Sequence, residues 1–179
     1  ILLAFLLAFS KFSSNISTPV DQIMGGMIYQ KKSDVRGAEY MKQGLIAPSM
    51  MCVDFSEMTS VIEAFEKNGI GYLHIDIMDG EFVPNYTLGT DFCRRLRTMT
   101  RIPLDLHLMI TRPDNKLDWF QIQPGEYVSV HWESTPHIPR VLARIRELGG
   151  KPMLALNPAT PLSVLDYVLE DIDGVLLMT

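Results

Sequence analysis

Short apolar runs recur along the chain and are separated by stretches with helical periodicity. The runs predict strands at about 45–49, 72–78, 103–109, 126–131, 152–157 and 174–178. Between several of them, apolar residues recur at the i, i+3, i+4, i+7 spacing of an amphipathic helix. The clearest series is Ile138, Val141, Leu142, Ile145 and Leu148. Alternation of strand and helix predicts a parallel sheet with helices outside it, either a barrel or a doubly wound sheet.

Turn-forming residues mark the ends of the predicted helices. The pairs Asn68-Gly69 and Gly149-Gly150 each follow a helical period, and Thr160-Pro161 precedes a third period from Leu162 to Leu169. Glycine after a helix and proline at its first position are typical boundary signals. No G-x-G-x-x-G or Walker-type loop follows any predicted strand, which favours the barrel. The predicted fold class is therefore α/β, a TIM (β/α)8 barrel.

The chain accounts for only part of such a barrel. We count six strands and five helices in 179 residues, whereas a complete barrel typically has about 250 residues. We therefore expect a C-terminally truncated partial barrel at residues 41–179, whose first and sixth strands are edges. Residues 1–40 are expected to be an N-terminal extension, disordered or non-native, with a targeting segment or a genuine helix as alternatives.

Composition argues against two classes of partner, nucleic acids and membranes. The formal net charge is −5 and the isoelectric point is about 5.3, which argues against a nucleic-acid partner. The apolar residues at the start of the chain are fewer than the roughly 20 that cross a bilayer, so no membrane partner is expected. Cys52 and Cys93 have neither metal-site spacing nor a disulfide framework. This favours a reducing compartment, and we predict a cytoplasmic protein.

Two predicted strands carry polar residues where buried strands should be apolar. Alternation places His74, Asp76 and Met78 on one face of the first, and His107 and Met109 on one face of the next. Burying unpaired polar groups costs several kcal/mol, about 2–7 for an uncharged group. A divalent metal is a suitable partner, because imidazole nitrogen and carboxylate oxygen bind Zn, Fe, Mn or Co.

Several polar residues keep a structural alternative. A buried histidine is more often a hydrogen-bonded core residue than a ligand, and His131 and Glu133 could either line a site or be structural. The same choice, between structural role and substrate contact, stays open for Asp79 and Asn85. Asp105 shares the face of His107 one layer deeper, so we interpret it as a structural partner rather than a ligand.

Five segments together resemble one known family. They are Ile46-Ala47-Pro48-Ser49-Met50-Met51, His74 through Asn85, Asp105 through Met109, Leu156 through Pro161, and Leu177-Met178-Thr179. From about Met41 onward, the chain resembles ribulose-phosphate 3-epimerase, including the allulose-6-phosphate 3-epimerase branch. The resemblance implies a TIM barrel and a divalent metal held by two histidines and two aspartates. It also implies inversion at C3 of a ketose phosphate through an enediolate.

Site roles can be carried over by position. His74, Asp76 and His107 resemble three metal ligands, and Asp76 also resembles one of two acid/base carboxylates. The substrate-contacting positions would be Ser49, His107, Met78, Met109 and Met178. The fourth ligand, which is the second acid/base aspartate, and the glycine-rich phosphate loops have no counterpart in this sequence.

The expected function is therefore that of a metal-dependent epimerase converting D-ribulose 5-phosphate to D-xylulose 5-phosphate. We expect the present residues to be inactive alone. For the complete protein the sequence leaves both a monomer and a homo-oligomer open. The alternatives are allulose-6-phosphate 3-epimerase activity and a non-catalytic barrel remnant.

Overall fold

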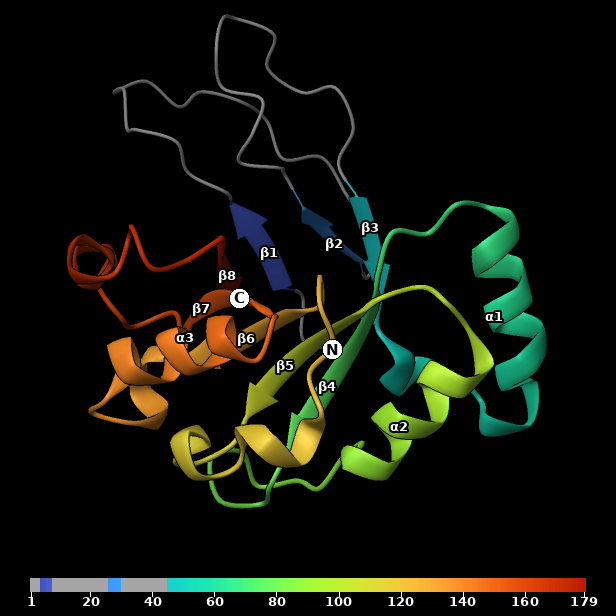
Figure 1. Cartoon of the computed structure of the whole chain (residues 1–179), viewed down its shortest axis with the longest axis horizontal. Coiled ribbons are helices and arrows are strands. Elements are labelled where there is room, and N and C mark those ends of the chain that lie inside the picture. The colour runs from blue at the N-terminus through green and yellow to red at the C-terminus, as the bar shows by residue number, and fades with distance from the viewer. Residues whose placement is uncertain (1–3, 8–25, 30–44) are drawn as a thin grey trace, which may run out of the picture.

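The computed structural model describes residues 4–7, 26–29 and 45–179 (Figure 1). Five parallel strands pair with their neighbours in chain order. They are β4 (Leu73–Met78), β5 (Leu104–Met109), β6 (Tyr127–His131), β7 (Lys151–Leu156) and β8 (Gly174–Met178). The α-helices are α1 (Met58–Lys67), which precedes β4, α2 (Thr90–Met99) between β4 and β5, and α3 (Ile138–Glu147) between β6 and β7. This is the α/β alternation that the sequence predicts.

The predicted helix ends hold for two helices and fail for the third. Gly69 and Gly149 follow α1 and α3 with φ of +67° and +89°, a conformation that glycine adopts without strain. The segment predicted to form a helix after Pro161 is instead a 3₁₀ helix, Leu162–Tyr167. Leu165 and Val168 are both buried, and their separation of three residues is compatible with either type of helix.

Short 3₁₀ helices also replace an α-helix between β5 and β6. They span Pro113–Asn115 and Leu117–Phe120, with Leu117 and Phe120 buried. At two of the five predicted helix positions, the structure therefore has 3₁₀ helices and not α-helices.

The first predicted strand is not a full member of the parallel sheet. β3 (Leu45–Pro48) pairs antiparallel with β2 (Gly26–Tyr29), and a single parallel bridge, from Ser49 just after β3 to His74, links it to β4. At the other edge, β1 (Ala4–Leu7) pairs antiparallel with β8. The expectation of unpaired edges at the first and sixth predicted strands is therefore wrong. The remainder of the extension predicted at 1–40, namely 1–3, 8–25 and 30–40, lies outside the described residues.

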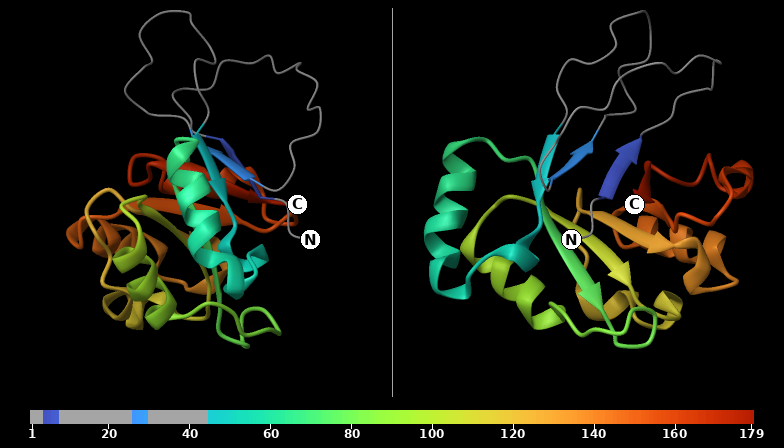
Figure 2. Two further views of the ribbon diagram at one scale, coloured as in Figure 1. Left: turned by 90° about the vertical axis from the view of Figure 1, so that its right-hand side faces the viewer. Right: turned by 180° about the vertical axis from the view of Figure 1, so that it is seen from behind.

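The two faces of the sheet have different chemistry. Outward-facing strand residues such as Ile75 and Leu106 pack with Ile62, Leu96 and Leu142 from the helices in one apolar core, and Figure 2 shows the helices along this side of the curved sheet. The opposite, inner face carries the polar strand residues and a smaller apolar cluster. That cluster consists of Ala47, Tyr72, Tyr127, Met153, Ala155 and Leu176. Every residue of β4 and β5 is buried, as is usual for parallel strands.

Among the helices of the described residues, none is long and apolar enough to cross a membrane.

Candidate metal centre

Three inward-facing side chains of β4 and β5 converge on one point. The register places Asp76 opposite His107, and His74 one layer deeper on β4. Asp76 Oδ1 lies 3.1 Å from His74 Nε2 and 3.2 Å from His107 Nδ1. One ligand atom from each residue lies within 4.8 Å of the others, and all three residues are buried. The structure thus brings together the three ligands that the sequence suggests.

A second carboxylate fixes the orientation of His74. Asp105 is fully buried, and its Oδ2 makes a short contact with His74 Nδ1. An ionised carboxylate only accepts hydrogen bonds, so Nδ1 carries the proton and Nε2 is left facing Asp76. Carboxylates paired in this way with the far nitrogen of a metal-binding histidine are common in metalloproteins. The placement agrees with the interpretation of Asp105 as a structural partner.

Two hydroxyl groups hold Asp76 from other directions. Ser49 Oγ donates to Asp76 Oδ2 at 2.6 Å, which places this predicted substrate-contacting residue at the site. Thr87 Oγ1 donates to the main-chain oxygen of Asp76, also at 2.6 Å. The sequence carries no signal for Thr87, because its contact depends on how the loop after β4 folds back on the strand.

The charges at the centre are strongly coupled. Burial opposes protonation of His74, but the carboxylates of Asp105 and Asp76 outweigh it and raise its pKa to about 10. Burial also disfavours the ionised form of Asp76, but hydrogen bonds from His107 and His74 hold the pKa of this carboxyl well below its usual range. Burial lowers the pKa of His107. At neutral pH the centre therefore holds the ionised carboxylate of Asp76 between the protonated ring of His74 and the neutral ring of His107.

His131, at the end of β6, also belongs to the site. Its Nε2 lies 2.9 Å from His107 Nε2, and the ring of Phe82 covers it at a centroid distance of 4.8 Å. Burial and the nearby His107 lower the pKa of His131 to about 3. Of the two roles left open by the sequence, the structure supports site lining for His131. His137, in contrast, is exposed at the start of α3.

The predicted methionines lie at different distances from the centre. Met78 and Met109 are buried and opposite one another, two positions beyond Asp76 and His107 on the same strand faces. Met178 is half-buried on β8 and packs against the inner apolar cluster. Asp79 is not free to act as a ligand, because its carboxylate accepts from Lys116 Nζ and from main-chain N–H groups.

The donor set fits a transition-metal ion. Two imidazole nitrogens and one carboxylate oxygen form the set of three protein ligands typical of catalytic sites, which keep further positions for water or substrate. Zn, Fe, Mn and Co all accept these donors. The group His74, Asp76 and His107 could therefore hold a divalent cation.

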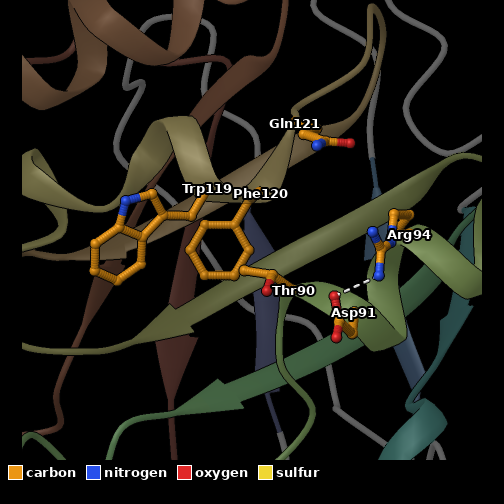
Figure 3. Close-up of a pocket in the computed structure, with 6 residues that line it drawn as sticks. All are labelled: Thr90, Asp91, Arg94, Trp119, Phe120 and Gln121. Carbon is orange, nitrogen blue, oxygen red and sulfur yellow. Dashed lines mark hydrogen bonds and ion pairs between the residues drawn. The ribbon is translucent and has the colours of Figure 1, made fainter.

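A hollow elsewhere on the surface is not a candidate site. It lies between α2 and the 3₁₀ helix Leu117–Phe120 and has a volume of about 40 Å³ (Figure 3). Its lining residues are Thr90, Asp91, Arg94, Trp119, Phe120 and Gln121. Small-molecule sites usually occupy about 300–1,000 Å³, so this hollow is too small for a sugar phosphate.

Comparisons with known proteins identify the family of this chain. A sequence model of the ribulose-phosphate 3 epimerase family matches residues 45–179. A protein of Bacillus subtilis named ribulose-phosphate 3-epimerase is 43% identical over 134 residues, which cover 75% of this chain and 62% of the relative. A Synechocystis protein of the same name is 41% identical over 140 residues, 77% of this chain and 61% of the relative.

A plant protein is a further relative. The Arabidopsis thaliana protein named ribulose-5-phosphate-3-epimerase, chloroplastic, is 41% identical over 137 residues, 75% of this chain and 49% of the relative. The chain thus spans about half to three fifths of the length of these relatives. The match includes the strands that carry the candidate metal ligands. The chain belongs to the ribulose-phosphate 3-epimerase family.

Proposed function

We propose that the residues described here belong to a metal-dependent epimerase that converts D-ribulose 5-phosphate to D-xylulose 5-phosphate. The observation that carries the proposal is the convergence of His74, Asp76 and His107 within 4.8 Å at buried positions. The names of the relatives support the substrate. Active sites of barrels form at the carboxyl ends of the strands. Asp76 and His107 lie in the carboxyl-terminal halves of β4 and β5, and His74 lies one layer deeper.

The proposed reaction removes the proton at C3, next to the C2 carbonyl, and returns a proton to the opposite face. Negative charge develops on the substrate oxygens when the C3 proton leaves. A divalent cation held by His74, Asp76 and His107 would supply the positive charge that stabilises these oxygens. Zn, Fe, Mn and Co are the candidate ions.

Asp76 is the proposed proton carrier on one face of the substrate. Its carboxylate is ionised at neutral pH, which is the form that a proton acceptor must have. Ser49 holds Oδ2 at 2.6 Å, which limits rotation of the carboxylate and keeps it aimed in one direction. Inversion requires a second carrier on the other face. In the resemblance this is an aspartate of the seventh barrel strand, and we assign no second carrier among the described residues.

The proposed substrate contacts are Ser49, His107, Met78, Met109 and Met178. Methionine side chains are flexible and apolar, so they can follow a substrate that becomes planar at C3 while excluding water. They also carry no exchangeable proton that would compete with Asp76.

An activity assay tests the proposal on the full-length gene product that contains these residues. D-Ribulose 5-phosphate is supplied with added Mn, Fe, Co or Zn, and xylulose 5-phosphate formation is followed. His107→Asn should abolish turnover and weaken metal retention, whereas His137→Asn, at an exposed histidine, should change neither. Full activity with stoichiometric metal in the His107 variant would contradict the proposal. Turnover of allulose 6-phosphate alone would overturn the substrate assignment.

A further inference from the structure

Two buried histidines contact each other through their ring nitrogens. His107 Nε2 and His131 Nε2 lie 2.9 Å apart, and the rings are stacked with centroids 5.1 Å apart. Such a contact is a hydrogen bond only if one nitrogen carries a proton and the other presents a lone pair. One histidine must therefore donate and the other accept, and the groups that contact the two Nδ1 atoms decide which one donates.

A carboxylate lies at each end of this pair. On one side, His107 Nδ1 is 3.2 Å from Asp76 Oδ1. On the other, the buried His131 Nδ1 makes no hydrogen bond, and Glu133 Oε2 lies 3.5 Å from it. A small rotation of the Glu133 side chain, which is 27% exposed, would close this second contact. The row then runs from Asp76 through both rings to Glu133.

The number of ring protons decides whether every contact in this row of four side chains can be a hydrogen bond. Two neutral imidazoles carry two ring protons, one each, but the row contains three contacts. All three can be hydrogen bonds only if a third proton is added. If His107 Nδ1 instead gives its lone pair to a metal, two protons suffice: His107 Nε2–H donates to His131, and His131 Nδ1–H donates to Glu133. The row is thus fully satisfied when His107 is a metal ligand.

The structure holds Glu133 in place for this role. Its Oε1 accepts from the main-chain N–H of Asn157 at 3.1 Å and from Thr160 Oγ1, both in the loop after β7. These bonds leave Oε2 facing His131. The ring of Phe82 covers His131, which is 1% exposed, and limits competition from water.

We propose that Glu133, acting through His131, is a positioning residue that fixes the tautomer of His107 and so directs the Nδ1 lone pair to the metal. The inference rests on the metal site of the proposed function. It parallels the role of Asp105 at His74, where a carboxylate fixes the ring directly. The carboxylate of Glu133 performs the same task across one additional imidazole.

Ring-nitrogen NMR and metal titration test the proposal on the full-length protein. In the Zn²⁺-loaded, ¹⁵N-labelled protein, long-range ¹H–¹⁵N spectra should show the proton of His131 on Nδ1 and that of His107 on Nε2. Glu133→Gln keeps the size of the side chain but offers an N–H donor to His131 Nδ1. This variant should shift His131 toward the Nε2–H tautomer and weaken Zn²⁺ binding by about 10-fold to 100-fold, as loss of such outer partners typically does.

Two control variants separate this effect from other causes. Thr160→Val removes one bond to Glu133 but keeps the carboxylate, and Glu63→Gln changes an exposed glutamate on α1. Both should keep the wild-type tautomers and lose less Zn²⁺ affinity than the Glu133 variant. Unchanged tautomers and Zn²⁺ affinity in Glu133→Gln would overturn the proposal, as would an equal loss in Thr160→Val. A wild-type protein that binds Zn²⁺ without epimerase activity would contradict the proposed function and leave this inference standing.

Discussion

A buried ion pair links α2 to the start of β6, and its removal should destabilise the protein strongly. Arg97 Nε and Nη2 donate to Oε1 and Oε2 of Glu126, both at 2.8 Å. Arg97 Nη1 also donates to the main-chain oxygen of Phe120 at 3.1 Å, and Glu126 Oε2 accepts from Gln123 N at 2.9 Å. The two side chains are 18% and 3% exposed. Arg97→Met would keep the apolar stem and remove the guanidinium.

The expected cost follows from what Glu126 would lose. After the substitution its buried carboxylate would keep the main-chain donor of Gln123 but no cationic partner. Breaking a buried pair in this way typically costs about 3–5 kcal/mol. Because the Arg97 side chain is 18% exposed, water can partly replace it, and we expect about 3 kcal/mol, the lower end of that range. Glu126→Gln in the same chain removes the stranded charge, so the double variant should recover about half of the loss.

Urea unfolding at pH 7, followed by circular dichroism, measures the free energy of unfolding. The matched control is Arg94→Met on the same helix. Arg94 and its partner Asp91 are 63% and 87% exposed, and exposed pairs contribute about 0–1 kcal/mol. An Arg97 variant no less stable than the Arg94 variant would refute the reasoning, as would a double variant less stable than Arg97→Met.

Two further predictions concern the loop after β4. Burial opposes ionisation of Asp79, but main-chain N–H groups and Lys116 hold its pKa well below the usual value of about 4. The carboxylate therefore stabilises the fold above about pH 4. As the pH falls from about 5 to about 3, the excess stability of wild type over Asp79→Asn should shrink. A constant difference between their free energies of unfolding in urea would contradict this. Gly80 has φ of +78° and an added Cβ would overlap the ring of Tyr86, whereas Gly69 at +67° has open space. Ala at Gly69 should cost about 1 kcal/mol and Ala at Gly80 more, and equal costs would argue against the Tyr86 contact.

The sequence predicts the centre because its pattern is local. Alternation alone places His74 and Asp76 on one strand face, and parallel pairing brings His107 opposite Asp76. Neither step depends on details of loop structure. The same reasoning predicts the inward position of Asp105, since residues two apart on a strand share a face.

Other features depend on contacts between distant segments. Glu133 reaches Asn157 across 24 positions of the sequence, and the sequence alone therefore leaves its role and that of His131 open. The antiparallel partners of β3 and β8 are residues 26–29 and 4–7, respectively, a part of the chain with no clear strand period. The 3₁₀ helix after Pro161 escapes prediction because its buried residues fit both helical periods over so short a segment.

Exchange of the C3 proton with solvent tests the central claim most directly. D-Ribulose 5-phosphate is incubated with the full-length, metal-supplemented protein in D₂O, and NMR follows the proton at C3. The proposed role of Asp76 predicts deuterium at C3 of both sugars, and an exchange rate lower by about 100-fold to 10,000-fold in Asp76→Asn, the range that general acid–base catalysis contributes. Exchange at the wild-type rate in the Asp76 variant, or turnover without deuterium at C3, would contradict it.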